Sequence, residues 1–117
     1  FVYEHTGDSF RADALNDGSN PRQIEQMLST MVQNLVRMRK HGFSHGDMKP
    51  PNLLITPDRT VLLDLDGVRQ HTDPKVCERA LAKDTARWIR WWEKNDPQPR
   101  IGERSRTLLK AAGFAVN

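Results

Sequence analysis

Two short apolar runs in the middle of the chain constrain its fold more than any other feature. Leu53–Thr56 and Thr60–Leu65 are separated by three residues, 57–59, that include a proline and an aspartate. This pattern is typical of a β-hairpin with a tight turn. A hairpin brings the residues before its first strand close to those after its second strand. Polar residues crowd both places, in 43–52 and in 64–67, so the sequence predicts one polar site built beside a hairpin over 53–66.

A long amphipathic helix is predicted before the hairpin, over about residues 21–41. Asn20 can cap its first turn, and Gly42 is a natural stop because glycine tolerates the backbone conformation at a helix end. Apolar residues recur at helical spacing along this segment and are expected to be buried on one face. They are Ile24, Met27, Leu28, Met31, Leu35 and Met38.

Two more helices are predicted after the hairpin, over about 74–94 and over 104–112. Asp73 can cap the first of them, and prolines between the two helices indicate a linker. One stripe of the helix over 74–94 is apolar: Cys77, Leu81, Trp88 and Trp92. Another stripe is basic: Arg79, Lys83, Arg87, Arg90 and Lys94. With the hairpin, these helices predict an α+β chain that is mostly helical.

Composition narrows the class of protein. Hydrophobic residues make up 37% of the 117 residues, which is enough for a folded core. No apolar run is long enough to cross a membrane, and no segment has the layout of a signal peptide. The single cysteine, Cys77, excludes an internal disulfide framework and a cysteine-built zinc site, and it predicts the reducing cytoplasm.

Charge is concentrated in the second half of the chain. Residues 1–58 carry a net charge of −1 and residues 59–117 carry +4. A basic balance permits nucleic acid, an anionic membrane or a phosphorylated substrate as partner, but no nucleic-acid-binding motif is present. The basic stripe, with Trp91 and Trp92, could lie on an anionic membrane surface or contact phosphorylated sugars. A charged helix face that is merely solvated is the alternative.

The polar residues beside the predicted hairpin suit phosphoryl transfer. Asp47 can take the proton of an acceptor hydroxyl, and Lys49 can reach the transferred phosphate from an extended loop. Asn52 supplies an amide oxygen, a hard ligand suited to Mg²⁺. The hairpin would return the chain so that an aspartate, Asp64 or Asp66, lies opposite Asn52.

The order of these residues resembles the protein-kinase-like superfamily. The run from His45 to Leu54 reads His-Gly-Asp-Met-Lys-Pro-Pro-Asn-Leu-Leu and looks like its catalytic loop, within the predicted loop 43–52. Asp64-Leu65-Asp66 resembles its metal-binding triplet, and residues 1–7 resemble the hinge between its two lobes. The resemblance spans roughly residues 1–95. It implies that residues 1–117 form a mostly helical C-lobe that works with ATP and Mg²⁺.

The resemblance also implies roles for individual residues. Asp47 and Lys49 would be catalytic, and Lys49, Asn52 and Asp64 would bind the nucleotide. Asn52 and Asp64 would hold the metal, with Asp66 as the alternative carboxylate. Side chains alternate along a strand, so both aspartates would start on one face, and the later one would swing away where the strand ends near Gly67.

Two further residues would support the catalytic loop rather than react. His45 is expected to bridge the loop to the strand that carries Asp64. Asp84 lies between Leu81 and Trp88 on the buried side of its helix. By resemblance, its carboxylate would accept hydrogen bonds from backbone amides of the catalytic loop.

Within the superfamily, the sequence most resembles bacterial lipopolysaccharide kinases, the Kdo/WaaP family and its InaA-type relatives. The features that carry this resemblance are the Asp-Leu-Asp triplet, the segment Ala80–Trp88, and the pair Trp91-Trp92. Gly46 stands where regulated protein kinases place an arginine, and the connection from Gly67 to the next helix is too short for a peptide-docking segment. A small molecule or glycolipid, in particular a lipopolysaccharide core sugar, is therefore the expected acceptor, which would place the protein in the cytoplasm or at the inner membrane.

Two rival functions stay open at this point. One is a different small-molecule kinase of the aminoglycoside-phosphotransferase type. The other is a noncatalytic pseudokinase that binds a partner or a membrane through its basic helix. The presence of Asp47, Asn52 and Asp64 argues against a decayed site.

The chain is expected to be a piece of a longer protein. It begins without a methionine in an apolar run, Phe1-Val2-Tyr3, and contains no glycine-rich loop or phosphate-pairing lysine of an N-lobe. With half of the nucleotide cleft absent, the isolated chain is predicted to be inactive. The apolar surface near Phe1, Val2 and the hairpin is predicted to favour self-association.

Overall fold

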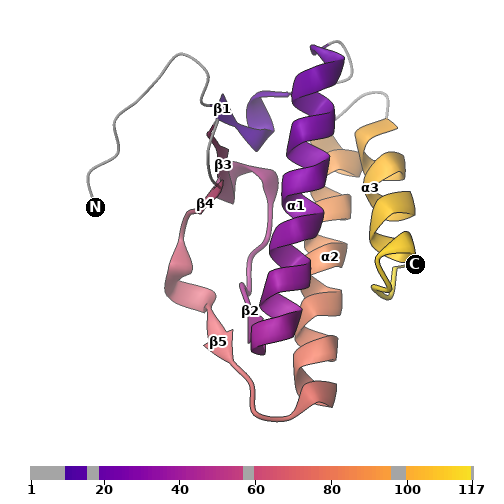
Figure 1. The fold of residues 1–117 in the computed structure, drawn as a ribbon. Helices are drawn as coiled ribbons and strands as arrows, with labels where there is room; N and C mark the ends of the chain where they lie inside the picture. Colours follow the sequence, from indigo (N-terminus) through magenta and orange to yellow (C-terminus); the bar gives the residue numbers. More distant parts are fainter. Residues whose placement is uncertain (1–9, 16–18, 57–59, 96–99, 117) are drawn as a thin grey trace.

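The computed structural model describes residues 10–15, 19–56, 60–95 and 100–116 (Figure 1). The expected hinge at 1–7 and the turn of the hairpin at 57–59 lie outside these residues.

Three helices make up most of the fold: α1 (Pro21–His41), α2 (Pro74–Asn95) and α3 (Arg100–Ala111). The amide of Arg22 donates to Asn20 Oδ1 over 2.8 Å at the start of α1. The amide of Lys75 donates to Asp73 Oδ1 over 2.9 Å at the start of α2. The side chains expected to cap these helices therefore do so, because each satisfies an amide that has no partner in the first turn.

Helix α3 begins at Arg100, four residues before the start that the sequence indicated at 104. Pro97 and Pro99 made residues 95–100 look like a linker. Gly102 is in fact buried, and a Cβ built on it would lie 3.4 Å from Cβ of Trp92. The glycine thus lets the first turn of α3 pack closely on α2, and this packing outweighs its weak helix propensity.

The predicted hairpin is present, and a third strand extends it. Strands β3 (Leu53–Ile55) and β4 (Thr60–Leu62) are antiparallel, and β1 (Phe10–Arg11) pairs with the other edge of β3. Strand β1 is new at this point, because Thr6–Pro21 contains turn signals such as Gly7, Asp17-Gly18 and Asn20-Pro21 and was therefore interpreted as a loop, which is wrong at Phe10–Arg11. Ala12 and Leu15, just after β1, are buried and form part of the core that sequence periodicity did not indicate.

A second small sheet joins two segments that were expected to be irregular. Strand β2 (Phe43–Ser44) pairs antiparallel with β5 (Arg69–Gln70). Next to this pair, the amide of His71 donates to the carbonyl of Gly42 over 2.7 Å. The start of the loop at 43–52, which is expected to be catalytic and is called the catalytic loop below for that reason, is thereby tied to the segment that leads into α2.

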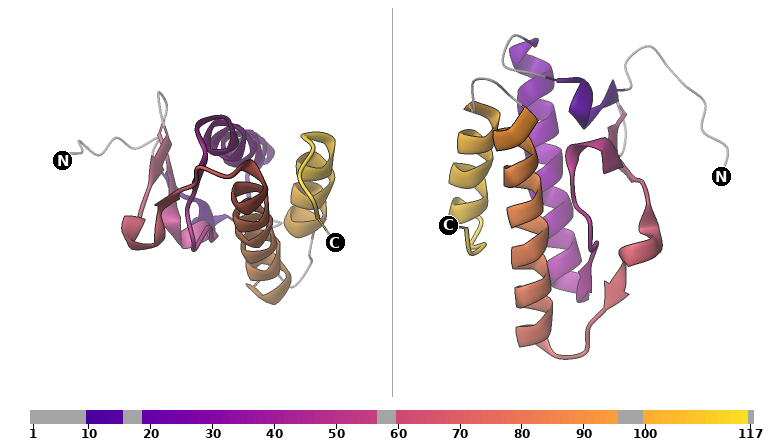
Figure 2. Two further views of the ribbon diagram at one scale, coloured as in Figure 1. Left: turned by 90° about the horizontal axis from the view of Figure 1, so that it is seen from below. Right: turned by 180° about the vertical axis from the view of Figure 1, so that it is seen from behind.

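Helices α1 and α2 separate the strands from α3. Seen from below, the strands and α3 lie on opposite sides of the pair formed by α1 and α2 (Figure 2). Trp88 on α2 donates from Nε1 to Oγ of Ser105 on α3 over 2.9 Å. The side chains that fill the core at less than 2% exposure include Met27, Leu28, Met31, Leu35, Met48, Leu53, Ile55, Leu81, Trp88, Trp92, Ile101 and Leu109.

The burial of the tryptophans corrects one expectation. Trp92 is 1% exposed, so its ring does not form a surface with the basic stripe of α2, while Trp91 is half-buried and packs partly against the core. In the part of the chain that the structure describes, no helix has the length and hydrophobicity needed to cross a membrane.

Candidate active site

Asp84 anchors the catalytic loop to α2. Its carboxylate is 1% exposed and accepts hydrogen bonds from the amides of His45 and Gly46 over 2.8 and 2.9 Å. These are the contacts that the resemblance implied. Burial raises the pKa of Asp84, and the two amide hydrogen bonds only partly offset that effect. A buried carboxylate without such partners would be strongly destabilising, so helix and loop depend on each other.

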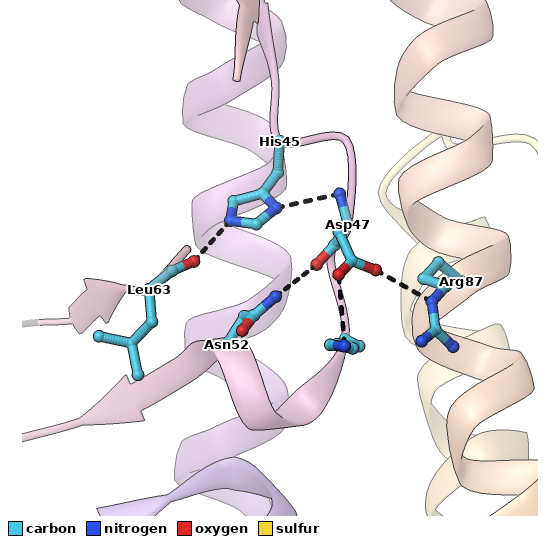
Figure 3. A network of polar contacts seen from close by, with 6 residues as sticks. His45, Asp47, Asn52, Leu63 and Arg87 are labelled. Carbon is cyan, nitrogen blue, oxygen red and sulfur yellow. Dashed lines mark hydrogen bonds and ion pairs between the residues drawn. The ribbon is translucent and has the colours of Figure 1, made fainter. Parts of the chain in front are cut away.

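His45 connects the loop to the end of the hairpin (Figure 3). The amide of Asp47 donates to Nδ1 over 3.1 Å, so Nδ1 is an acceptor. The other nitrogen, Nε2, lies 2.9 Å from the carbonyl oxygen of Leu63 and must donate to it. Both contacts require the neutral ring with its proton on Nε2. The fully buried imidazole therefore fixes the distance between Asp47 and the residue that precedes Asp64.

Two glycines bring the loop against the turn that follows β4. Gly46 has a φ of +93°, and a Cβ built on it would lie 2.6 Å from the carbonyl oxygen of Gly67. A Cβ on Gly67 would lie 3.0 Å from the carbonyl oxygen of His45. Only residues without side chains allow the two backbones to approach this closely. The glycine at 46 is thus a packing requirement, a role that the sequence pattern did not reveal.

Asp47 lies between two cations. Its Oδ1 is 3.1 Å from Nε of Arg87, and its Oδ2 is 3.4 Å from Nζ of Lys49. Partial burial would raise the pKa of Asp47, but the hydrogen bonds and charges of Arg87 and Lys49 outweigh it and lower the pKa below the ordinary value. The side chain is 37% exposed, so the ionised carboxylate remains accessible to a ligand.

Sequence reasoning missed Arg87 as a site residue and grouped it with the basic stripe. The available signal was its spacing from Asp84. Residues three apart lie on the same side of a helix, so Arg87 lies one turn after Asp84 on the face that points toward the catalytic loop. Once Asp84 is placed under the loop, Arg87 reaches the side chain of Asp47.

Asn52 is oriented by the loop itself. Its Nδ2 donates to the carbonyl of Asp47 over 2.9 Å, and its own carbonyl accepts from the amide of Leu63 over 2.8 Å. The amide oxygen Oδ1 is therefore the end of the side chain that can serve as a metal ligand. The bond to Leu63 also brings the chain that carries Asp64 beside Asn52.

The turn after β4 differs from the geometry expected for the two aspartates. Strand β4 ends at Leu62, and Asp64 has a φ of 54° in the left-handed region. Leu65–Gly67 form a 3₁₀ turn, so the chain leaves the strand before Asp64 rather than near Gly67. Alternation along a strand therefore cannot choose between Asp64 and Asp66, and both carboxylates are exposed.

The donor set fits a magnesium ion bound together with phosphates. Among the described residues, no three histidine, cysteine, aspartate or glutamate side chains gather where they could hold a metal. Mg²⁺, however, is commonly held by one or two protein oxygens while phosphates and water complete the octahedron. The amide oxygen of Asn52 and the carboxylate of Asp64 are ligands of that kind, joined through Leu63.

Comparison with known proteins agrees with this geometry. The family model described as "RIO domain" matches residues 1–104. The chain belongs to the RIO domain family. It is therefore protein-kinase-like, and its fold is the α+β, mostly helical C-lobe of that superfamily.

Two curated relatives support the same superfamily. The "Probable serine/threonine-protein kinase HAL5-like" of Eremothecium gossypii is 30% identical over 67 residues, which are 54% of this chain and 10% of that protein. The "Cell division control protein 2 homolog C" of Antirrhinum majus is 36% identical over 69 residues, which are 53% of this chain and 23% of that protein. The RIO domain chain thus matches less than a quarter of the length of either relative.

Proposed function

We propose that this RIO domain chain is the catalytic lobe of an ATP-dependent phosphotransferase that transfers the γ-phosphate to a hydroxyl group. The observation that carries the proposal is the state of Asp47. Its carboxylate is ionised, 37% exposed, and held in one place by Arg87 and Lys49. A fixed, accessible carboxylate is what a transferase needs in order to orient an acceptor hydroxyl.

Each site residue has a role in this reaction. Asp47 accepts the hydrogen bond of the acceptor hydroxyl. It can do so while it contacts both cations, because a carboxylate has more lone pairs than these two contacts use. The acceptor oxygen forms a bond to the γ-phosphorus while the bond from that phosphorus to the β–γ bridging oxygen breaks. ADP leaves with the electron pair, and the hydroxyl proton passes to Asp47. Lys49, next to Asp47, neutralises charge on the transferred phosphate.

Asn52 and Asp64 are the proposed ligands of Mg²⁺. The support for Asp64 over Asp66 is that Leu63 is held on both sides, by His45 at its carbonyl and by Asn52 at its amide. When bound, the ion would neutralise charge on the phosphates of ATP. Asp64 directly follows Leu63, whereas Asp66 lies three residues beyond it.

A small molecule or glycolipid is the acceptor class that we propose, with a lipopolysaccharide core sugar as the specific candidate. The support is the short connection between the site and α2. The 3₁₀ turn ends at Gly67 and α2 begins at Pro74, so six residues join them, and two of these are used in β5. The segment Ala80–Trp88, which resembles lipopolysaccharide kinases, follows directly in α2.

The test is phosphate transfer by the full-length protein that contains this chain, with Mg-ATP and candidate sugars. Asp47→Asn should lower turnover by about 10²- to 10⁴-fold, the usual worth of a positioned general base. Nucleotide affinity should change little, because Asp47 is assigned to the acceptor. Glu103→Gln, a carboxylate-to-amide change on the exposed side of α3, is the control and should leave turnover unchanged. Near-normal turnover of Asp47→Asn would overturn the proposal.

The isolated chain should bind ATP weakly. The proposed site provides only one side of a nucleotide cleft, so the phosphates would stay solvated and their charge contacts screened. Calorimetry of the 117-residue chain with Mg-ATP should give an affinity no tighter than roughly millimolar, on the order of −4 kcal/mol. Micromolar binding would show that this chain forms a complete nucleotide site by itself.

A further inference from the structure

Arg87 has donors that its contact with Asp47 does not use. The contact runs from Nε, and the side chain is 37% exposed. A guanidinium carries further donors on its two Nη atoms, in a planar arrangement that matches the oxygens of a phosphate or carboxylate. The residue beside the proposed acceptor site is therefore suited to bind an anion.

The surface on either side of Arg87 is positive. Lys83, Arg90 and Lys94 are exposed and follow helical spacing on the same side of α2. Arg79 extends this stripe toward the start of the helix.

Acidic residues of α2 do not neutralise the stripe. Glu78 pairs with Arg39 over 3.0 Å, and Glu93 lies 3.5 Å from Arg106. Asp84 is buried under the catalytic loop. The three acids of α2 thus have partners on other elements, and the stripe attracts negative charge to the end of the site where Asp47 lies.

We propose that the acceptor of this RIO domain protein is itself anionic, with a phosphate or carboxylate group near the hydroxyl that becomes phosphorylated, and that Arg87 binds this group. The inference rests on the proposed function and deepens it by naming the acceptor class. Because Arg87 touches Asp47, an anion on its Nη atoms would place a neighbouring hydroxyl beside the Asp47 carboxylate. A neutral acceptor would gain no such anchor.

Anion binding by the 117-residue chain tests the proposal without requiring catalysis. Glycerol 3-phosphate and glycerol form a matched pair of probes, since they differ only in the phosphate group. In ¹⁵N NMR, glycerol 3-phosphate should shift the Arg87 Nε–H signal in a saturable way, whereas glycerol should not. Arg87→Gln should weaken the affinity for glycerol 3-phosphate, read from the catalytic-loop amides, by about tenfold, the usual worth of one charge-assisted contact.

The control variant is Arg79→Gln. Arg79 lies on the same stripe but about 12 Å along the helix axis from Arg87, at about 1.5 Å per residue, so its loss should leave the affinity nearly unchanged. Equal responses to the two probes would overturn the proposal. So would equal affinities of Arg87→Gln and the unaltered chain, or equal weakening by the two substitutions, which would indicate a diffuse charge effect.

Transfer assays with the full-length protein separate this inference from the proposed function. The ratio of kcat/KM for glycerol 3-phosphate to that for glycerol should exceed tenfold, fall toward one in Arg87→Gln, and be partly restored in Arg87→Lys. No transfer to any hydroxyl would refute the proposed function, while the NMR result would still decide the anion site. Transfer with no preference for the anionic probe would refute only the anionic acceptor.

Vesicles distinguish a lipid-borne anion from a free one. If the anion belongs to a lipid headgroup, the chain should sediment with phosphatidylglycerol vesicles but not with phosphatidylcholine vesicles. Arg87→Gln should then lower the sedimented fraction more than Arg79→Gln does. Absence of sedimentation together with NMR binding of glycerol 3-phosphate would assign the site to soluble acceptors. Absence of both would overturn the proposal.

Discussion

The catalytic loop and the turn at 64–67 lie against each other, yet the fold holds them very differently. In the loop, His45 is fully buried and two backbone amides are fixed by the buried Asp84. In the turn, Asp64 and Asp66 are exposed and Leu65 is 58% exposed. The side chain of Asp64 does not cap the 3₁₀ turn, which is held by Arg69 at the Asp66 carbonyl and lies against the loop at Gly67.

This difference separates the two halves of the proposed site. The half that would orient an acceptor hydroxyl is organised by the chain itself, through Asp84 and His45. The half that would hold a metal is positioned through Leu63, the glycine contact and a hydrogen bond from Arg69 to the Asp66 carbonyl, and its carboxylates stay solvated. A bound nucleotide, which brings its own oxygens to the metal, is what would complete that half.

The largest effect should come from removing the proposed metal carboxylate. In the full-length protein, Asp64→Ala should reduce phosphate transfer by about 10³-fold or more, because charge stabilisation by a metal is worth several kcal/mol. Asp66→Ala should be milder. Turnover of both variants, measured across a magnesium titration, checks this prediction. A stronger loss of turnover in Asp66→Ala would assign the metal to Asp66 instead of Asp64.

Gly46→Ala should destabilise the fold by about 2–5 kcal/mol. The estimate combines the strain of a positive φ with the cost of forcing a methyl group against a fixed backbone carbonyl. Gly113→Ala is the matched control, since Gly113 has a φ of +89° but a Cβ there would meet only the guanidinium of Arg39 at 3.5 Å, an ordinary van der Waals distance. Urea unfolding of both variants measures the difference, and equal midpoints would mean that the contact with Gly67 contributes nothing.

Asp84→Ala should cost about 2–4 kcal/mol, because it leaves two buried amides without acceptors. Asp66→Ala should change the free energy of unfolding by less than about 0.5 kcal/mol, as is usual for an exposed side chain. Thermal unfolding of the two aspartate variants compares the buried anchor with the solvated turn directly. Similar melting temperatures would contradict the view that α2 holds the loop.

The smallest effect concerns pH. The pKa of Asp84 is raised in the folded chain, so its titration favours folding below the unfolded-state value of about 3.9 and loses that contribution as pH rises through the folded-state pKa. The free energy of unfolding of the unaltered chain minus that of Asp84→Asn should therefore be larger at pH 4 than at pH 7. Denaturant unfolding at both pH values checks the sign, and the reverse order would show that the two amide hydrogen bonds outweigh burial.

Local patterns in the sequence were sufficient for α1, for α2 and for the presence of the hairpin. The expected span 21–41 matches α1, Pro21–His41, and α2 ends one residue beyond the expected 94. Helical spacing and capping residues report on contacts within a few residues, so they can be read from the chain alone. The same applies to the order of His45, Asp47, Asn52 and Asp64, which carried the superfamily resemblance.

Long-range contacts decided the rest. Strand β1 forms because Phe10 pairs with Ile55, 45 residues away in the sequence, and no local pattern records that partner. The early end of β4 and the left-handed Asp64 accompany the close approach of Gly46 and Gly67, which are 21 residues apart in the sequence.

Arg87 shows the same division most clearly. Its sequence neighbours describe a basic helix stripe, and only the docking of α2 under the catalytic loop brings its guanidinium to Asp47. The sequence by itself therefore determined the candidate residues for the proposed phosphoryl transfer, apart from Arg87, and where the helices α1 and α2 lie. The tertiary structure decided which charges meet, because a carboxylate 40 positions from a guanidinium becomes its neighbour only when buried anchors such as Asp84 fix one backbone against another.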